Sequence, residues 1–372
     1  MNISLDLPEG SDLSLFEGKW YAPWGVLPAL ILLPLQPQTT GYSVDPIFLS
    51  LLSASLNVGF IFLFLHRLKR EFFPRLTSWE IYLLLILFTF GTAHFLVGIK
   101  DGVWFIDQMV STTLGVVGLY VIFKKNRTPR DYLLSSILFS LAFLGRATIS
   151  LLIVIPVFLY LDDFILHRNN ILVAFRQHLA KIITLFVLPW LGFVFILLLY
   201  NYLRFKNPFE FGYSYIQDNL YLAQFRLASG PFSLRHLPRN LWYMLLEIPC
   251  LSLDSNYKIS LDYNPNGNSI FFLTPPFLAI FLAKPFLKVR RRWRLDPYIA
   301  ALWLAVVITI IPSLLFYSSG WWQLGYRFSL DIVPVLWLLS ILGIKGRLNF
   351  LYVLGILFSV VVHFIGVNSW IR

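Results

Sequence analysis

Long apolar runs with few or no charges recur along this sequence, and they decide its class. Residues 47–65, 81–97 and 103–123 each provide about 17 residues or more, the length that a helix needs to cross a bilayer. Hydrophobic residues make up 58% of the chain, and the mean hydropathy of +0.71 is too high for a water-soluble globule. Backbone groups in lipid must pair internally, and the short alternating segments of a barrel are absent from the sequence. We therefore expect an all-α fold, a multi-pass transmembrane helical bundle with about eight to eleven membrane helices, including short or re-entrant ones.

Basic residues cluster between the apolar runs. Most of the 30 Lys and Arg residues lie within residues 66–75, 124–131, 162–181, 284–294 and 345–347. The positive-inside rule places these five segments in the cytoplasm. Alternation then predicts membrane spans at residues 45–66, 79–97, 103–123, 181–203, 269–287, 297–317, 328–343 and 348–366.

Three further segments complete the predicted organisation of a single membrane domain over residues 1–372. Residues 24–35 lie between prolines and are too short to span, so we interpret them as a re-entrant or partial helix after an exterior loop at 1–23. Residues 133–161 are interrupted by Gly145 and Arg146 and flanked by basic loops, which predicts a hairpin of two short helices with Arg146 at its outward tip. The tract 204–268 predicts an exterior loop on the membrane surface, with amphipathic helices near 214–227 and 237–248.

Several classes of function are not supported by the sequence. The single cysteine, Cys250, cannot form an internal disulfide, and no Cys/His cluster has the spacing of a zinc site. The net charge is +11, but the basic residues lie between apolar spans, where positive charge sets the membrane topology. We therefore expect no nucleic-acid partner. The GxxxxGK[ST], GxSxG and HExxH motifs are absent from the sequence. We expect no cofactor, and a requirement for a divalent metal stays open.

Ionisable residues inside apolar sequence are the first candidates for a site. Each one costs about 2.5 to 3.5 kcal/mol at the centre of a membrane helix and so needs a reason. Arg146 either binds a phosphate through its planar guanidinium or extends from a hairpin turn to the membrane surface. Arg327 and Asp331, four residues apart on an expected helix, form either a mutual ion pair or a site beneath the exterior segment 320–326.

Further candidates lie at the exterior ends of two spans. Asp101 and Asp107 flank the start of the span at 103–123, where a carboxylate can act as a general base, bind a metal or cap a helix. Capping explains Asp107 less well, because it lies about a turn inside the helix. Arg204 and Glu210 provide both signs of charge beside a span end, which suits an anionic headgroup or an ordinary solvated helix end. Together these residues predict an exterior, partly basic and aromatic-rich site for an anionic amphiphile such as a lipid phosphate.

Six segments, taken in order, resemble bacterial members of the GT-C superfamily. These are polytopic glycosyltransferases akin to the dolichyl-phosphate-mannose protein mannosyltransferases and the aminoarabinose transferase. The segments are 12–29 (DLSLFEGKWYAPWGVLPA), 102–108 (GVWFIDQ), 141–148 (LAFLGRAT), 204–213 (RFKNPFEFGY), 232–240 (FSLRHLPRN) and 325–334 (GYRFSLDIVP). They are distributed over nearly the whole chain, and their order and spacing carry the resemblance more than any single segment does.

The resemblance implies transfer of a sugar from a polyprenyl-phosphate donor to a glycan, lipid or protein acceptor, on the non-cytoplasmic face of the plasma (inner) membrane. In such enzymes an acidic residue of the first exterior loop commonly acts as the base or orients the acceptor, while Arg, Lys and Tyr side chains bind the donor phosphate. For this chain the resemblance implies catalytic roles for Asp107 and Asp101, donor binding by Arg146, Arg204, Tyr326 and Arg327, and acceptor or loop roles for Asp12, Glu210 and Asp331.

The chain departs from the family pattern at its start. In the family a first transmembrane helix precedes the exterior loop, and the key acid follows that helix closely. The few residues before Phe16 form no apolar span, so we expect the usual catalytic acid upstream of Met1. Three hypotheses stay open: an active glycosyltransferase, a transporter or flippase of a lipid-linked sugar, and a non-catalytic truncated relative. Prolines in short spans suit a transporter, although the sequence has no paired broken helices in two halves.

Overall fold

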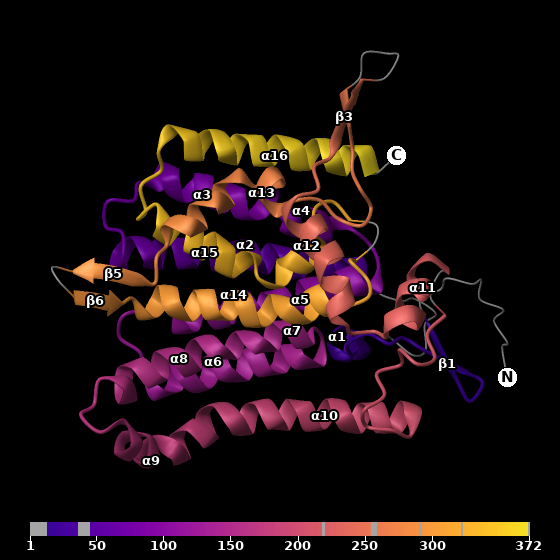
Figure 1. The fold of residues 1–372 in the computed structure, drawn as a ribbon, viewed down its shortest axis with the longest axis horizontal. Helices are drawn as coiled ribbons and strands as arrows, with labels where there is room; N and C mark the ends of the chain where they lie inside the picture. The colour runs from indigo at the N-terminus through magenta and orange to yellow at the C-terminus, as the bar shows by residue number, and fades with distance from the viewer. Residues whose placement is uncertain are drawn as a thin grey trace.

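The computed structural model describes residues 13–35, 45–217, 220–253, 259–289, 292–320 and 323–370. Within these residues the chain is mainly helical, and its strands form three two-stranded hairpins (Figure 1). Six helical segments are long and apolar enough to cross a membrane: Ile47–Glu71, Val103–Ile122, Ala147–Leu166, Ile171–Phe205, Pro297–Leu315 and Phe350–Ser369. The prediction of an all-α, multi-pass bundle is therefore confirmed, and the chain is a membrane protein.

Four predicted spans are single helices close to their expected positions. They are α2 (Ile47–Glu71), α5 (Val103–Ile122), α14 (Pro297–Leu315) and α16 (Phe350–Trp370). Helix α14 begins where the Asp296 side chain accepts hydrogen bonds from the backbone N–H groups of Tyr298 and Ile299, which otherwise have no partner at a helix start. Helix α5 is mostly buried and lies against α2 and the hairpin helices, so it forms part of the core around which the site is built.

The predicted span at 79–97 is broken rather than straight. Helices α3 (Ser78–Phe90) and α4 (Ala93–Ile99) meet at an angle of 56°. At the break the Thr92 hydroxyl donates to the carbonyl of Phe88, and the Thr274 hydroxyl donates to the carbonyl of Gly91. A broken helix inside a membrane protein needs such partners for its freed backbone groups, so the N-cap residue of α4, Thr92, and the distant Thr274 stabilise the bend.

The predicted hairpin at 133–161 is confirmed. Its first arm is α6 (Pro129–Leu141) with the 3-10 turn η2 (Ala142–Leu144), and its second arm runs through α7 (Ala147–Ser150), η3 (Leu151–Ile153), α8 (Val154–Leu161) and the π-helical turn η4 (Asp162–Leu166). Figure 1 shows α6 and α8 side by side, and they are in contact. The chain reverses at Gly145 and Arg146, as the sequence predicts.

The next span begins earlier than predicted. Helix α9 (Ile171–Ile182), the π-helical turn η5 (Ile183–Val187) and α10 (Leu188–Phe205) form one helical segment on the outer edge of the bundle (Figure 1). The sequence assigned 162–181 wholly to a loop, which is wrong for its second half. Helix α9 can begin at Ile171 because the Asn170 side chain caps it by accepting a hydrogen bond from the N–H of Val173.

Two predicted crossings are not full spans. In the segment predicted at 269–287, α13 (Ile270–Leu273) ends before Pro275 and is followed by the 3-10 helix η7 (Pro275–Leu282), because proline lacks an N–H and holds the preceding residue out of the helical conformation. In the segment predicted at 328–343, the 3-10 helix η8 (Arg327–Asp331) precedes α15 (Val333–Gly343). Helix α15 is about 16 Å long and buried on all sides, so it is a core helix within the bundle.

Short elements complete the fold. The partial helix predicted at 24–35 is confirmed as α1 (Leu27–Leu32) with η1 (Leu33–Leu35). In the tract after α10, α11 (Leu220–Ser229) begins later than predicted, because Ile216 pairs instead with Ser14. The second predicted amphipathic helix is confirmed as η6 (Leu234–His236) and α12 (Leu237–Leu245).

The bundle has two distinct ends. The loop end contains β1 (Ser14–Phe16), β2 (Lys19–Tyr21), β3 (Cys250–Leu253) and β4 (Ile259–Asp262), together with the described residues 206–217, 220–253, 259–269, 316–320 and 323–327. The basic end contains β5 (Phe286–Val289) and β6 (Arg292–Leu295), together with the described residues 66–75, 124–131, 284–289, 292–296 and 345–347. Figure 1 shows β3 and α11 at the loop end and β5 and β6 at the opposite end. Segments predicted on different sides of the membrane therefore lie at opposite ends of the bundle.

Candidate functional site

A cavity of about 410 Å³ lies at the loop end, between α5, the hairpin turn, α10 and α14. Three charged side chains enter its mainly apolar walls: Asp107, Arg146 and Arg204. The other lining residues are Pro23, Trp24, Gly25, Phe143, Gly145, Ala147, Thr148, Leu151, Leu197, Phe211, Tyr213, Phe232, Pro312, Ser313, Phe316 and Phe328. An apolar cavity with a few convergent polar groups is the usual form of a ligand-binding site.

Two glycines allow the backbones around this cavity to approach closely. A Cβ atom on Gly25 would lie 2.3 Å from the Cα atom of Gly145, and a Cβ atom on Gly145 would lie 2.3 Å from Oγ of Ser111 and 2.8 Å from Oδ1 of Asp107. These distances are well below van der Waals contact, so neither position has room for a side chain. The two glycines thus bring the segment before α1 and the hairpin turn against α5, and they bring Arg146 near Asp107.

Asp331 connects three separate elements beside the cavity. Its side chain is fully buried, and its carboxylate accepts hydrogen bonds from Nε of Arg146 at 3.1 and 3.2 Å, from Nε2 of Gln108 at 2.9 Å and from the Thr148 hydroxyl. Gln108 belongs to α5, Arg146 and Thr148 belong to the hairpin turn, and Asp331 ends η8. A buried carboxylate that accepts this many hydrogen bonds holds its donors in place.

The ion pair of Asp331 corrects two interpretations made from the sequence. Among the described residues Asp331 pairs with Arg146, and no ion pair joins it to Arg327. The reason is that η8 is a 3-10 helix with three residues per turn, so its first and fifth residues do not share a face as they would in an α-helix. Extension of Arg146 to the membrane surface is also wrong, because the guanidinium points inward to Asp331.

The orientation of Arg146 leaves part of its guanidinium group facing the cavity. Its backbone N–H donates to Oγ of Ser111 at 3.1 Å, and its guanidinium carbon lies 4.8 Å from the ring centroid of Phe328. Within the described chain, the side-chain hydrogen bonds of Arg146 all start at Nε and end on Asp331. The two Nη groups therefore remain as donors for an anionic ligand in the cavity.

Arg204 is held more tightly by the protein. Its Nη1 donates to the carbonyl of Ala22 at 2.6 Å, its Nη2 donates to Oδ1 of Asn201 at 2.8 Å, and its guanidinium carbon lies 4.0 Å from the ring centroid of Tyr200. Arg204 thus joins the end of α10 to the segment that leads into α1. It lines the cavity as a fixed positive charge, although two of its nitrogen atoms already have protein partners.

The two acids flanking the start of α5 have different environments. Asp107 is 5% exposed and lines the cavity, and its Oδ1 atom has no hydrogen-bond partner among the described residues. Asp101 is exposed, and its carboxylate accepts a hydrogen bond from the N–H of Gly102 at 2.7 Å, outside the cavity. Of the two predicted catalytic acids, the structure brings Asp107 to the charged groups of the cavity.

The remaining predicted site residues lie outside the cavity lining. Tyr326 is fully buried and donates to the carbonyl of Ser313 at 3.3 Å. Arg327 is also buried, with its guanidinium carbon 4.8 Å from the ring centroid of Phe105. The Glu210 carboxylate accepts hydrogen bonds from the N–H groups of Gly212, at 2.7 Å, and Ser214, at 3.3 Å, and so shapes the turn that leads to Tyr213. Asp12 lies outside the described residues.

Three uncharged residues of this region were missed by the reasoning from sequence. Gln108 and Thr148 orient Asp331, and Tyr213 lines the cavity. Burial raises the pKa of the Tyr213 hydroxyl, so it stays a neutral hydrogen-bond donor. Gln108 and Thr148 each lie next to or near a residue that the sequence did single out, and a polar side chain inside an apolar span is the signal that could have found them.

The described residues contain no group of three or more His, Cys, Asp or Glu side chains arranged to hold a metal ion.

Comparisons with protein-family models, with curated proteins and with solved structures find no match for this chain. What the site can do is therefore argued from its own geometry.

Proposed function

We propose that this chain is a membrane glycosyltransferase of the GT-C type. It would move a sugar from a polyprenyl-phosphate donor to a glycan, lipid or protein acceptor on the non-cytoplasmic face of the plasma (inner) membrane. One observation carries the proposal: a carboxylate, Asp107, and an arginine with donors left for a ligand, Arg146, line the same apolar cavity at the loop end of the bundle. The chemistry needs both groups, one for the acceptor hydroxyl and one for the leaving phosphate.

The donor half of the cavity suits a lipid phosphate. The Nη groups of Arg146 can form two parallel hydrogen bonds to phosphate oxygens, and the fixed charge of Arg204 adds to the positive potential. Asp331 acts as a positioning residue, because its carboxylate holds Nε of Arg146 and so fixes the plane of the guanidinium. Leu151, Leu197 and the aromatic lining residues provide the apolar surface that the first isoprene units require.

The transfer step balances with the groups present in the cavity. The oxygen of the acceptor hydroxyl forms a bond to the anomeric carbon, the bond from that carbon to the phosphate oxygen breaks, and its electrons leave with the polyprenyl phosphate. Asp107 accepts the hydroxyl proton as a general base, and Arg146 stabilises the charge that develops on the phosphate. Preorganised donors in a site that excludes water are worth more than in solution, which suits the apolar walls of this cavity.

The proposal is tested with the full chain reconstituted in lipid vesicles that contain a labelled polyprenyl-phosphate sugar. A hydroxyl-bearing acceptor is supplied on the outer side of the vesicles, and release of polyprenyl phosphate is the readout. Asp107→Asn removes the base and is expected to slow the release by about 10² to 10⁴. Asp101→Asn is the matched control, because it changes an exposed carboxylate that precedes α5 and lies outside the cavity lining, and it should leave the rate unchanged. Equal rates for the two variants and the parent chain would exclude Asp107 as the base.

A second pair of variants tests the phosphate-binding role. Arg146→Lys keeps the positive charge but loses the planar fork, so it should weaken donor binding and slow release. Arg235→Lys, at an exposed position of η6, is the control and should behave as the parent chain. Full activity of Arg146→Lys, with the fold intact by circular dichroism, would remove bidentate phosphate binding from the mechanism.

A transporter or flippase for a lipid-linked sugar is the alternative, and the 56° bend between α3 and α4 favours it, since discontinuous helices are common in transporters. The same vesicles separate the two functions. A transporter would move the labelled lipid across the bilayer without release of polyprenyl phosphate, whereas a glycosyltransferase would release it.

A further inference from the structure

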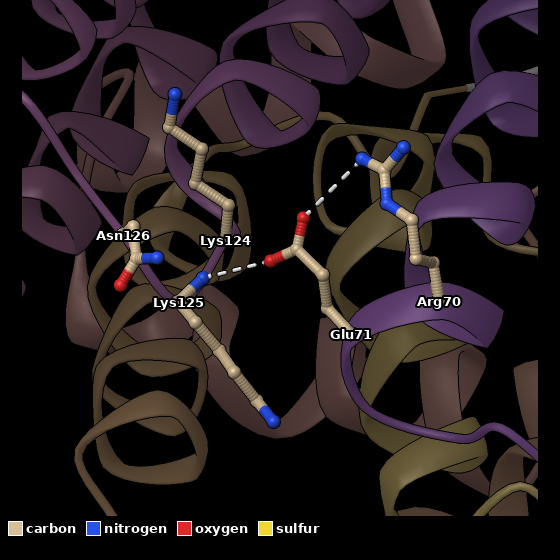
Figure 2. A pocket seen from close by; sticks show the side chains of 5 residues that line it. All are labelled: Arg70, Glu71, Lys124, Lys125 and Asn126. Carbon is tan, nitrogen blue, oxygen red and sulfur yellow. Dashed lines mark hydrogen bonds and ion pairs between the residues drawn. The ribbon is translucent and has the colours of Figure 1, made fainter.

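A second cavity, of about 340 Å³, lies at the basic end, where α2 and α5 end beside each other. It is lined by Arg70, Glu71, Lys124, Lys125 and Asn126, and Figure 2 shows these side chains. Three of the five side chains are cationic and one is anionic. The glycosyltransferase proposal makes no use of this cavity, which lies at the opposite end of the bundle from Asp107.

The single acidic residue of the cavity, Glu71, interacts with neighbouring protein groups. Oε2 of Glu71 accepts a hydrogen bond from the backbone N–H of Lys125 at 2.9 Å, and Oε1 lies 3.6 Å from Nη2 of Arg70. Figure 2 shows the Glu71 carboxylate between these two groups. Glu71 thus ties the end of α2 to the residues after α5, and it offsets only part of the surrounding positive charge.

Two of the three cations keep their charge available. Lys124 forms an ion pair with Asp131 at 2.7 Å. Nζ of Lys125, by contrast, lies 5.6 Å from the ring centroid of Phe72, and the described residues provide no carboxylate for it. Arg70 has a side chain that is 75% exposed. Figure 2 shows the Lys124 side chain pointing away from Lys125, and it shows Arg70 and Lys125 on opposite sides of the Glu71 carboxylate, so these two cations flank the cavity.

An exposed apolar stripe leads along α2 to this cavity. Leu52, Leu56 and Leu63 are each more than two-fifths exposed, and a Cβ atom on Gly59 would meet no other atom within 4 Å. Eighteen residues make about five full turns of an α-helix, so Leu52 and Arg70 lie on the same face. Leu56, Gly59 and Leu63 lie within about 40° of that face. The distance along α2 from Gly59 to Arg70 is about 16 Å, close to half of a hydrocarbon core about 30 Å thick.

We propose that this cavity binds the phosphodiester headgroup of an anionic phospholipid, with an acyl chain of that lipid along the Leu63, Gly59 and Leu56 face of α2. Charge and length both support this occupant. The phosphate would lie between the flanking side chains of Arg70 and Lys125, and the part of the stripe from Gly59 to Arg70 has about the length of one leaflet. Basic pockets between membrane helices are known to suit anionic headgroups.

The test uses the full chain in bicelles of mixed phosphatidylglycerol and phosphatidylcholine, with native mass spectrometry to measure how many molecules of each lipid remain bound. Arg70→Gln with Lys125→Gln removes both available cations. The preference for phosphatidylglycerol should fall about fivefold for each charge removed. Arg75→Gln with Arg168→Gln is the matched control, because it removes two exposed charges that do not line the cavity. Equal losses in the two double variants would reveal general attraction to a basic surface and overturn the site.

A second variant tests the acyl-chain half of the proposal. Gly59→Trp adds bulk at a position where the structure has open space, so it should leave the fold intact while it disturbs the chain along the stripe. It should lower phosphatidylglycerol retention and leave the binding of glycerol 1-phosphate unchanged. Unchanged lipid retention in Gly59→Trp, or displacement of the lipid by glycerol 1-phosphate at equal concentration, would show a free-anion site and overturn the lipid assignment.

Discussion

The buried ion pair between Arg146 and Asp331 can be tested by removing its negative charge. In Asp331→Asn the side chain keeps its size, but the Arg146 guanidinium, only 18% exposed, loses its counter-ion. In the parent chain Gln108, Arg146 and Thr148 all donate hydrogen bonds to the Asp331 carboxylate. The NH₂ group of the new amide is itself a donor, so it cannot accept from them. Breaking a buried ion pair costs about 3 to 5 kcal/mol, because one charge stays buried without compensation. We expect the free energy of unfolding to fall by about that amount.

The size of the loss in unfolding free energy distinguishes the Arg146–Asp331 ion pair of the structure from the Arg327–Asp331 ion pair that the sequence allowed. If Asp331 paired with Arg327 at a helix surface, the loss would be about 0.3 to 0.5 kcal/mol. A double-mutant cycle distinguishes the partners directly. Arg146→Met and Asp331→Asn should show a coupling energy above about 1.5 kcal/mol, whereas Arg327→Met and Asp331→Asn should show a much smaller one.

The assay is unfolding of the purified chain in mixed detergent micelles by increasing sodium dodecyl sulfate, followed by circular dichroism. Arg70→Gln is the control, because it breaks an ion pair whose arginine is 75% exposed, and it should change the unfolding free energy by less than about 1 kcal/mol. A coupling energy near zero for Arg146 and Asp331, or a larger one for Arg327, would refute the assigned ion pair and with it the positioning role of Asp331.

Three other outcomes follow from the structure. Gly145→Ala should destabilise the chain by about 1 to 3 kcal/mol in the same unfolding assay, since its Cβ would overlap atoms of α5, whereas Gly192→Ala, with no atom within 4 Å of its Cβ, should be neutral or slightly stabilising. Cys250, exposed at the loop end, should react with a membrane-impermeant maleimide on intact cells, and labelling only after permeabilisation would reverse the predicted orientation. Burial, followed by the charge of Arg327, lowers the pKa of Lys100 from 10.5 to about 8, so Arg327→Gln should raise the midpoint of its titration by nuclear magnetic resonance. Between about pH 8 and 10.5 the folded chain has released a proton that the unfolded chain retains, so stability should rise with pH there, and a fall would contradict the assignment.

The sequence by itself determined the properties that depend on neighbouring residues. Apolar runs long enough for a bilayer predict the membrane bundle, and the interruption at Gly145 and Arg146 predicts the hairpin, because helix length and helix breaks are local. It also identified the three charged residues that line the cavity, since a charge within or beside an apolar span always needs a reason. Where prolines or a 3-10 turn interrupt an apolar run, as in η7 and η8, hydropathy alone predicted crossings that the structure does not contain.

Only the tertiary structure decided which partners these charges have. Asp331 pairs with Arg146, which is 185 residues away in the chain, rather than with Arg327 four residues away. Asp107 enters the cavity while Asp101 stays outside, because Gly25 and Gly145 bring two distant segments against one face of α5. Such contacts depend on close backbone approach and on the number of residues per turn in one short helix, and neither appears in the hydropathy of a segment. The physical reason is that burial and pairing of a charge are properties of the space around it, which distant parts of the chain fill together.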